Sequence, residues 1–79
     1  MSVKEREQKA ALIELYNSSH GDAAHAAQVL AHTMKAAELK IIADGAVSLS
    51  ADITDVKMHN FAKELSEKIM TLIESRRGP

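Results

Sequence analysis

Apolar residues recur at helical spacing in three stretches of this chain, and polar residues fill the positions between them. Recurrence at intervals of three and four positions predicts a helix with one buried face. Turn-favouring residues at positions 17–21 separate the first stretch from the second. The pattern therefore predicts an all-α fold: a three-helix bundle with helices at about residues 3–17, 22–43 and 55–77, in a single domain of residues 1–79.

The second stretch contains a heptad-like seam, in which spacings of four and three alternate. Asp22 is a favourable N-cap, and no Gly, Pro or Asn interrupts residues 23–43. These features favour one continuous helix that ends at Asp44-Gly45. The seam consists of Ala23, Ala27, Leu30, Met34, Ala37 and Ile41.

The third stretch carries a broad apolar stripe that includes Phe61, one of only two aromatic residues in the chain. Charged residues such as Lys63 lie mostly away from this stripe. We expect the seam and the stripe to share the bundle core and a partner or dimer interface. The stripe residues assigned to that interface are Phe61, Leu65, Ile69 and Leu72.

Residues 46–54 follow a different period, because apolar and polar residues alternate strictly from Val47 to Thr54. Strict alternation is the period of a strand, and Asp44-Gly45 between apolar flanks is a hairpin signal. The stretch predicts a short β-arm or hairpin around residues 46–54, an extended connector, or one strand paired across a dimer.

Length and composition predict association with another chain. A chain of 79 residues buries little of its surface, and much of its apolar content is alanine, which contributes little burial per residue. Cysteine is absent, so disulfides cannot supplement the core. A homodimer is the simplest assembly that would supply the missing burial.

Charge and motifs argue against several function classes. The formal net charge is −1, which implies no strong attraction to nucleic acid or to an anionic membrane. No apolar run approaches the roughly 20 residues of a membrane span, and the charged N-terminus has no signal-peptide core, so we expect a cytoplasmic protein.

Catalysis and metal binding are not expected either. The chain has no phosphate-binding loop and no nucleophile motif. His25 and His32 are seven positions apart, whereas a chelating pair on a helix needs a spacing of three or four. We predict neither an enzyme nor a cofactor or metal site.

Residues 20–45 carry one further pattern: Gly21-Asp22, the pair Ala26-Ala27, Leu30, Lys40-Ile41 and Gly45. In this order they resemble the Fis-type helix-turn-helix, over about a third of the chain. The resemblance implies a turn near residues 31–33 and a second helix that reads DNA. It places four residues on or beside the DNA-reading face: Thr33, Met34, Lys35 and Lys40.

Two hypotheses for the function follow. The first is a helical protein–protein interaction module, of adaptor, regulator or inhibitor type, that acts as a homo-oligomer; seam continuity and neutral charge support it. The alternative is a helix-turn-helix transcription regulator that binds DNA through residues 22–45. The backbone near residues 31–33 distinguishes them, because a break there favours DNA binding and an unbroken helix removes its main support.

Overall fold

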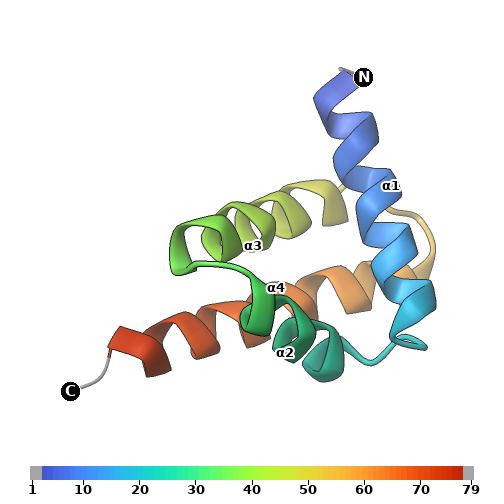
Figure 1. Cartoon of the computed structure of the whole chain (residues 1–79). Helices are drawn as coiled ribbons and strands as arrows, with labels where there is room; N and C mark the ends of the chain where they lie inside the picture. The colour runs from blue at the N-terminus through green and yellow to red at the C-terminus, as the bar shows by residue number, and fades with distance from the viewer. Residues whose placement is uncertain (1–2, 78–79) are drawn as a thin grey trace.

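The computed structural model describes residues 3–77, and the side chains of residues 6–76. Within this range the chain forms four helices: α1 (Val3–Ser18), α2 (Ala23–Thr33), α3 (Ala36–Ser50) and α4 (Val56–Arg77) (Figure 1). The all-α class is therefore confirmed, whereas the prediction of three helices is wrong by one. Residues 3–77 contain no strand, and none of the four helices combines the length and apolar character needed to cross a membrane.

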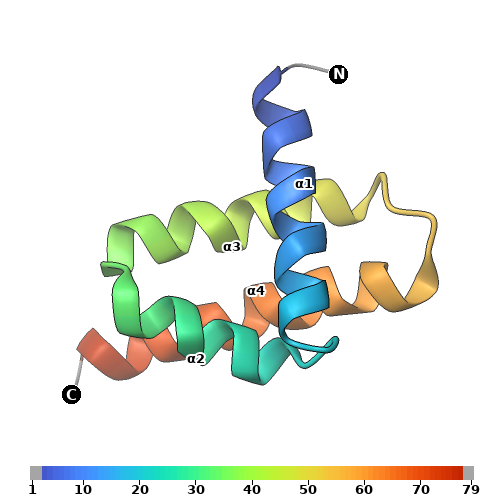
Figure 2. The same cartoon turned by 45° about the vertical axis from the view of Figure 1, so that its right-hand side comes forward.

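Helix α4 is the element on which α2 and α3 pack. Both lie against α4, and they contact each other little. Helix α1 contacts each of the other three sparsely, and its N-terminal half extends beyond α3 (Figures 1 and 2). The core therefore lies along α4, with α1 as its least attached wall.

The buried face of α4 follows the predicted stripe. Phe61, Leu65, Ile69 and Ile73 recur every four residues and are at most 3% exposed, as expected for one face of a helix. The alanines of α2 and α3 that meet this face let the helices approach closely. These small buried residues are Ala23, Ala26, Ala27, Ala43 and Ala46.

The two aromatic residues meet in the core and connect α1 to α4. The rings of Tyr16 and Phe61 form an edge-to-face pair, with centroids 5.1 Å apart and planes at 87°. This arrangement brings the positive edge of one ring to the negative face of the other. With the buried Leu12, this pair anchors the C-terminal half of α1.

The turn after α1 ends the helix as the sequence predicts. The N–H of Gly21 donates to the carbonyl of Tyr16 (2.9 Å), and the N–H of His20 donates to that of Asn17 (3.3 Å). This is a Schellman motif, with His20 (φ 56°) and Gly21 (φ 77°) in the left-handed region. Asp22 then begins α2 as its N-cap, because its carboxylate accepts the N–H of His25 (3.1 Å).

The continuous helix predicted for residues 22–43 is wrong. Met34 (φ −123°, ψ 149°) and Lys35 (φ −78°, ψ 161°) are extended and separate α2 from α3. The guanidinium of Arg76, on α4, donates to the carbonyls of Met34 (3.2 Å) and Ala31. Carbonyls at a helix C-terminus lack partners within the helix, and a cation there also complements the helix dipole. A residue more than 40 positions away in the sequence thus stabilises the break.

The break also shifts the buried face of α3 by two positions. In a continuous helix the seam would have buried Ala37 and Ile41, but both are exposed. The two extended residues change the helical phase, so Leu39 and Ala43 are buried instead, both at 0% exposure. The seam therefore ends at Met34.

Helix α3 also continues past its predicted end. It runs through Asp44-Gly45 to Ser50, so residues 46–50, predicted to be extended, are helical. The imidazole Nδ1 of His59 lies 2.7 Å from the carbonyl oxygen of Ser50 and donates to it, which provides a partner at the end of α3. Asp55 begins α4, because its carboxylate accepts the N–H of Met58 (2.9 Å).

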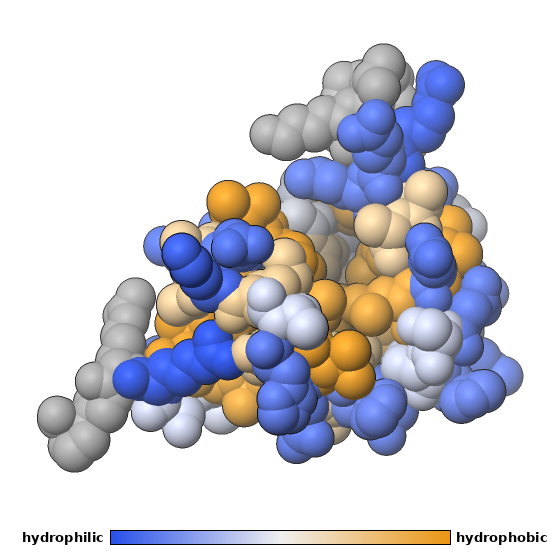
Figure 3. All heavy atoms as spheres, in the orientation of Figure 1, coloured by the Kyte–Doolittle hydropathy of each residue, from blue (hydrophilic) through white to orange (hydrophobic). Residues whose placement is uncertain are grey.

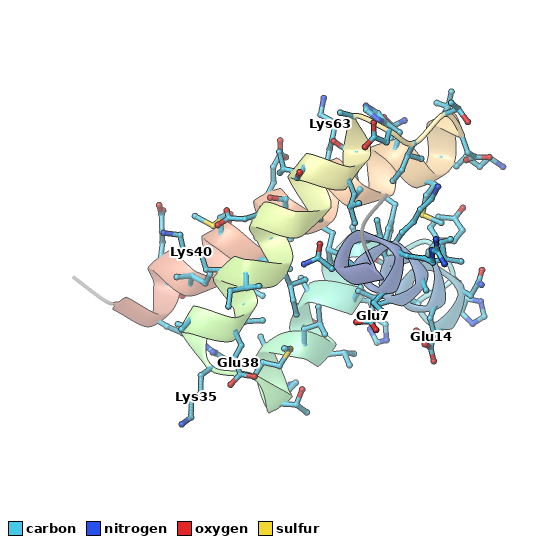
Figure 4. The ribbon with its side chains drawn as sticks, turned by 90° about the horizontal axis from the view of Figure 1, so that it is seen from above. Glu7, Glu14, Lys35, Glu38, Lys40 and Lys63 are labelled. Atoms are coloured by element: carbon cyan, nitrogen blue, oxygen red, sulfur yellow. The ribbon has the colours of Figure 1, made fainter. Side chains whose placement is uncertain are left out.

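We expect Phe61→Ala to lower the free energy of unfolding by about 3–5 kcal/mol, the cost of truncating a buried aromatic residue. The ring is 3% exposed and contacts Tyr16. Lys63→Ala is the control, because Lys63 is exposed and points away from the bundle (Figure 4), and it should change stability by less than about 0.5 kcal/mol. Urea melts of both variants test this, and an unchanged midpoint for Phe61→Ala would contradict the core described above.

We expect Gly45→Ala to raise the free energy of unfolding by about 0.5–1 kcal/mol, because glycine is unfavourable inside a helix. A Cβ at position 45 would lie 3.6 Å from the Gln8 side chain, an ordinary contact. Gly21→Ala should destabilise instead, since φ is +77° and the Cβ would lie 3.3 Å from the Tyr16 ring. Thermal melts test this, and melting temperatures that change in the same direction in both variants would contradict the prediction.

Candidate functional site

An apolar groove lies between α1 and α3, with α2 at one side and α4 beneath it. Its cavity volume is about 180 Å³, and Figure 3 shows apolar side chains gathered around the hollow on this face. Gln8 is the one polar side chain among its lining residues, all of which belong to the described part of the chain. The lining consists of Gln8, Ala11, Leu12 and Leu15 of α1, Leu30 of α2, Ile41, Ile42, Gly45, Ala46 and Leu49 of α3, and Leu65 of α4.

Small residues on the two facing helices leave this space open. Ala11 of α1 and Gly45 and Ala46 of α3 all line the groove, and the α1 side chain nearest to Gly45 is that of Gln8. None of the three small residues has a side chain long enough to reach across. Leu65 of α4, which is 0% exposed, forms part of the floor of the groove.

Ile41 forms part of the groove rim and is 62% exposed. Val47, on the same helix, is 52% exposed but does not line the groove. Single exposed apolar residues are common on protein surfaces, whereas an exposed isoleucine that continues an apolar concavity is typical of a binding site. These two residues therefore provide a matched pair on one helix.

Glu7 and Glu14 on α1 and Glu38 on α3 are exposed, and they lie on one side of the molecule (Figure 4). Lys35 lies near Glu38, whereas Lys40 lies on the opposite side of α3 (Figure 4). None of these five residues is among those that line the groove.

The structure divides the predicted interface residues into two groups. Half are in the chain's own core, and the remainder are partly or fully accessible. Ala23, Ala27, Phe61, Leu65 and Ile69 are buried, Leu30, Met34 and Leu72 are half-buried, and Ala37 and Ile41 are exposed. Leu30, Ile41 and Leu65 come together in the groove from three helices, so the proposed site includes three of the ten.

Sequence reasoning missed the α1 wall and most of the α3 wall of the groove. Gln8, Ala11, Leu12 and Leu15 recur at intervals of three, one and three, which is the helical signal for one face. Ile42, Gly45, Ala46 and Leu49 form the corresponding face of α3. The continuous-helix prediction obscured this second face, because it ended the helix at Gly45.

The four residues assigned to DNA reading do not form one surface. The Thr33 hydroxyl donates to the carbonyl of Leu30 (3.3 Å), back along α2. Met34 is half-buried, and its carbonyl accepts from Arg76. Lys35 and Lys40 are both exposed but lie on opposite sides of α3 (Figure 4).

A second cavity, of about 380 Å³, lies between α1 and the link from α3 to α4. Its polar side chains carry both charges, since Lys9 and Lys57 face the same space as Asp52 and Asp55. The Asp55 carboxylate is engaged as the N-cap of α4. Within the described residues, no three histidine or acidic side chains converge closely enough to hold a metal ion.

The described residues therefore form an apolar concavity with an exposed isoleucine at its edge, rather than a constellation of reactive groups. Comparisons of this chain with protein-family models, with curated proteins and with solved structures found no match in any of the three.

Proposed function

We propose that this protein is a helical interaction module that binds another protein through the groove between α1 and α3. The observation that carries the proposal is the exposed Ile41 at the rim of an apolar concavity. Clefts with a mostly apolar lining and few polar groups are the usual binding sites of small domains. A concavity of about 180 Å³ is of a size to receive an apolar side chain of a partner protein.

The basis of this proposal differs from the one the sequence suggested. The continuous seam no longer supports it, because α2 and α3 are separate helices. Support now comes from the groove, whose residues belong to four helices, and from the formal net charge of −1. A near-neutral chain has no general attraction to polyanions, so an apolar protein surface is the better-matched partner.

DNA binding by α2 and α3 is the second candidate, and the break at Met34-Lys35 is the observation that favours it. The break lies just after the turn that the Fis-type resemblance implies at residues 31–33. Phosphate contacts supply much of the affinity in DNA binding, however, and each exposed lysine here has an acidic neighbour: Glu38 lies near Lys35, and Asp44 is four positions after Lys40. Arg76 is engaged at the end of α2. We therefore rank this function second.

We also propose that the module acts as a homodimer. Among the residues whose side chains the structure describes, six of the thirteen buried hydrophobic residues are alanine, and the largest fully buried side chains are Leu39, Leu65 and Ile69. Such a core supplies little stabilisation, because burial free energy scales with apolar area. Small domains of this kind commonly gain stability by association.

We expect Ile41→Glu to abolish binding of the native partner protein, because a carboxylate at the rim would have to be desolvated against an apolar surface. Val47→Glu introduces the same charge on the same helix outside the groove and should leave binding intact. Affinity capture from the native host with wild-type protein and both variants as baits tests this. The proposed function fails if a protein retained by wild type is retained equally by Ile41→Glu.

The same capture tests the second candidate. If wild-type protein retains host DNA, and Lys35→Ala with Lys40→Ala abolishes that retention while Ile41→Glu does not, DNA binding becomes the favoured function. Circular dichroism spectra of all variants control for loss of folding, since each substitution is at an exposed residue.

We expect sedimentation equilibrium at micromolar concentration to give a mass of about twice the 8.6 kDa of the chain. The mass should be unchanged in Ile41→Glu, because the groove is assigned to a different protein. A monomer mass together with a cooperative thermal transition would show that the alanine-rich core suffices alone and would exclude the dimer.

A further inference from the structure

We propose that the link between α2 and α3 is a hinge, and that the homodimer forms by exchange of helices across it. In that dimer the link straightens, α2 and α3 become one helix, and residues 3–33 of each copy pack on α3 and α4 of the other. This inference rests on the proposed homodimer and specifies how its two copies assemble. Three observations support it: the sequence of the link, its hydrogen bonds and the distribution of contacts between the helices.

The link has the sequence of a helix rather than of a turn. Its two extended residues are Met34 and Lys35, and neither is one of the Gly, Pro, Asn or Asp residues that usually end a helix. Methionine and lysine are both favourable inside a helix. The heptad-like seam also continues across the link to Ala37 and Ile41. Residues 23–43 are therefore suited to one uninterrupted helix once the packing that imposes the break is released.

The hydrogen bonds at the link would be replaced if the helix straightened. The guanidinium of Arg76 donates to the carbonyls of Ala31 and Met34. In a continuous helix a carbonyl accepts from the N–H four residues later, so Lys35 and Glu38 would supply these two donors. Among the described residues, the N–H of Lys35 donates to no backbone carbonyl, and it would gain one. Straightening therefore keeps both carbonyls paired and releases Arg76.

The contacts between helices define two units that separate at the link. Helices α3 and α4 contact each other more than any other pair, whereas α2 packs mainly on α4 and contacts α3 little. The chain reverses direction between α2 and α3 (Figure 2), so a straight helix cannot keep both of them on the same α4. Because the contact between α3 and α4 is the larger, α1 and α2 are the unit that would move away.

Moving α1 and α2 away uncovers apolar surface on both units. The face of α2 that its buried alanines form would lose its contact with α4, and Phe61 would lose the ring of Tyr16. A second copy that has opened in the same way offers matching surfaces, because each surface is already complementary to the other within one chain. Exchange of identical elements is therefore a low-cost route to a dimer.

The exchange leaves the groove intact. Its α1 and α2 walls would come from one copy and its α3 and α4 walls from the other, with the same lining residues. Binding of another protein at Ile41 therefore does not depend on the exchange, so the groove and the exchange fail or stand separately.

Proline at position 35 fits the bent link but not the straight helix. Lys35 has φ −78°, close to the roughly −65° that a proline ring imposes, and Met34 (φ −123°, ψ 149°) is extended, as the residue before a proline prefers. Inside a helix, proline removes a donor and clashes with the preceding turn. We expect Lys35→Pro to raise the dissociation constant of the dimer at least about a hundredfold in sedimentation equilibrium. Lys35→Ala removes the same charge, favours the helix, and should leave the dimer intact.

Removal of Arg76 should act in the opposite direction. Its hydrogen bonds to the carbonyls of Ala31 and Met34 exist only in the bent link, so Arg76→Ala should tighten the dimer about tenfold, since each dimer gives up two such sets of bonds. Lys68→Ala removes an exposed cation from the same helix and should leave the dissociation constant unchanged. Equal effects of the two substitutions would overturn the hinge.

The two aromatic residues report on the exchange in the wild-type protein. The chain has one Tyr and one Phe, their ring centroids lie 5.1 Å apart, and the hinge places them in different units. Two samples are deuterated except at the ring of Tyr16 in one and of Phe61 in the other. They are mixed, unfolded in urea and refolded. A nuclear Overhauser effect between the two rings then arises only between copies, and each sample alone is the control.

We expect this signal in the wild-type dimer and its absence from Lys35→Pro. A wild-type dimer without the signal consists of intact monomers, which overturns the exchange and leaves the homodimer standing. Dimerisation of Lys35→Pro as tight as that of Lys35→Ala overturns the exchange as well. If wild type and Arg76→Ala are both monomers, the homodimer and the exchange fail together, while capture through Ile41 remains a separate test of the groove.

Discussion

The two extended residues Met34 and Lys35 decide which side chains this protein buries. They end α2 and restart the helix two positions out of phase, so that α2 and α3 each turn an alanine-containing face toward α4. A continuous helix would have been about 30 Å long, and as one straight element it could have packed against only one part of the α4 surface. The break instead lets two short helices cover two parts of the α4 surface. The guanidinium of Arg76, near the end of α4, binds the carbonyls at the break and links the last turn of the chain to its middle.

The groove is a consequence of this arrangement. Helices α2 and α3 both pack on α4 and contact each other little. On the side away from α4, the space between them is covered by α1. Helix α1 is anchored at its C-terminal half by Tyr16 and Leu12. Towards α3, the groove is lined by small residues, Ala11 of α1 and Gly45 of α3, with the Gln8 side chain beside Gly45.

The sequence predicted the helical class, the turn at residues 17–21, the Asp22 cap and the buried face of α4, because each depends on residues close together in the chain. It did not predict the break at Met34-Lys35. No local breaker is present there, and the group that stabilises the break is Arg76, more than 40 positions away. The seam contributed to the error. Its residues up to Met34 do share a face, but its heptad spacing continues through Ala37 and Ile41 and gives no sign of the two-residue phase shift. The Fis-type resemblance implied a turn close to the observed position.

The extended structure predicted from the strand-like alternation at residues 46–54 was wrong over residues 46–50 for a related reason. Val47 and Leu49 alternate with serines, but the same residues also satisfy a helix, since Ala46, Leu49 and Ser50 recur at intervals of three and one and are all buried. Serine at position 50 adds a helix-compatible hydrogen bond to the carbonyl of Val47 (2.7 Å). Short stretches of this kind satisfy both periods, and tertiary packing decides between them.

The candidate site could be predicted only in part, because it depends on where small residues meet. Ile41 was predicted to be an interface residue as a member of a seam that does not extend that far. Its exposure follows from the phase shift, which turned it away from α4 and toward α1. Asp44-Gly45 was interpreted as a stop signal, but α3 continues through it, and Gly45 lines the groove together with Ala46. Unfilled space between helices costs stability through lost dispersion contacts. A partner side chain that filled the groove would supply such contacts, and this links the alanine-rich core to the proposed function.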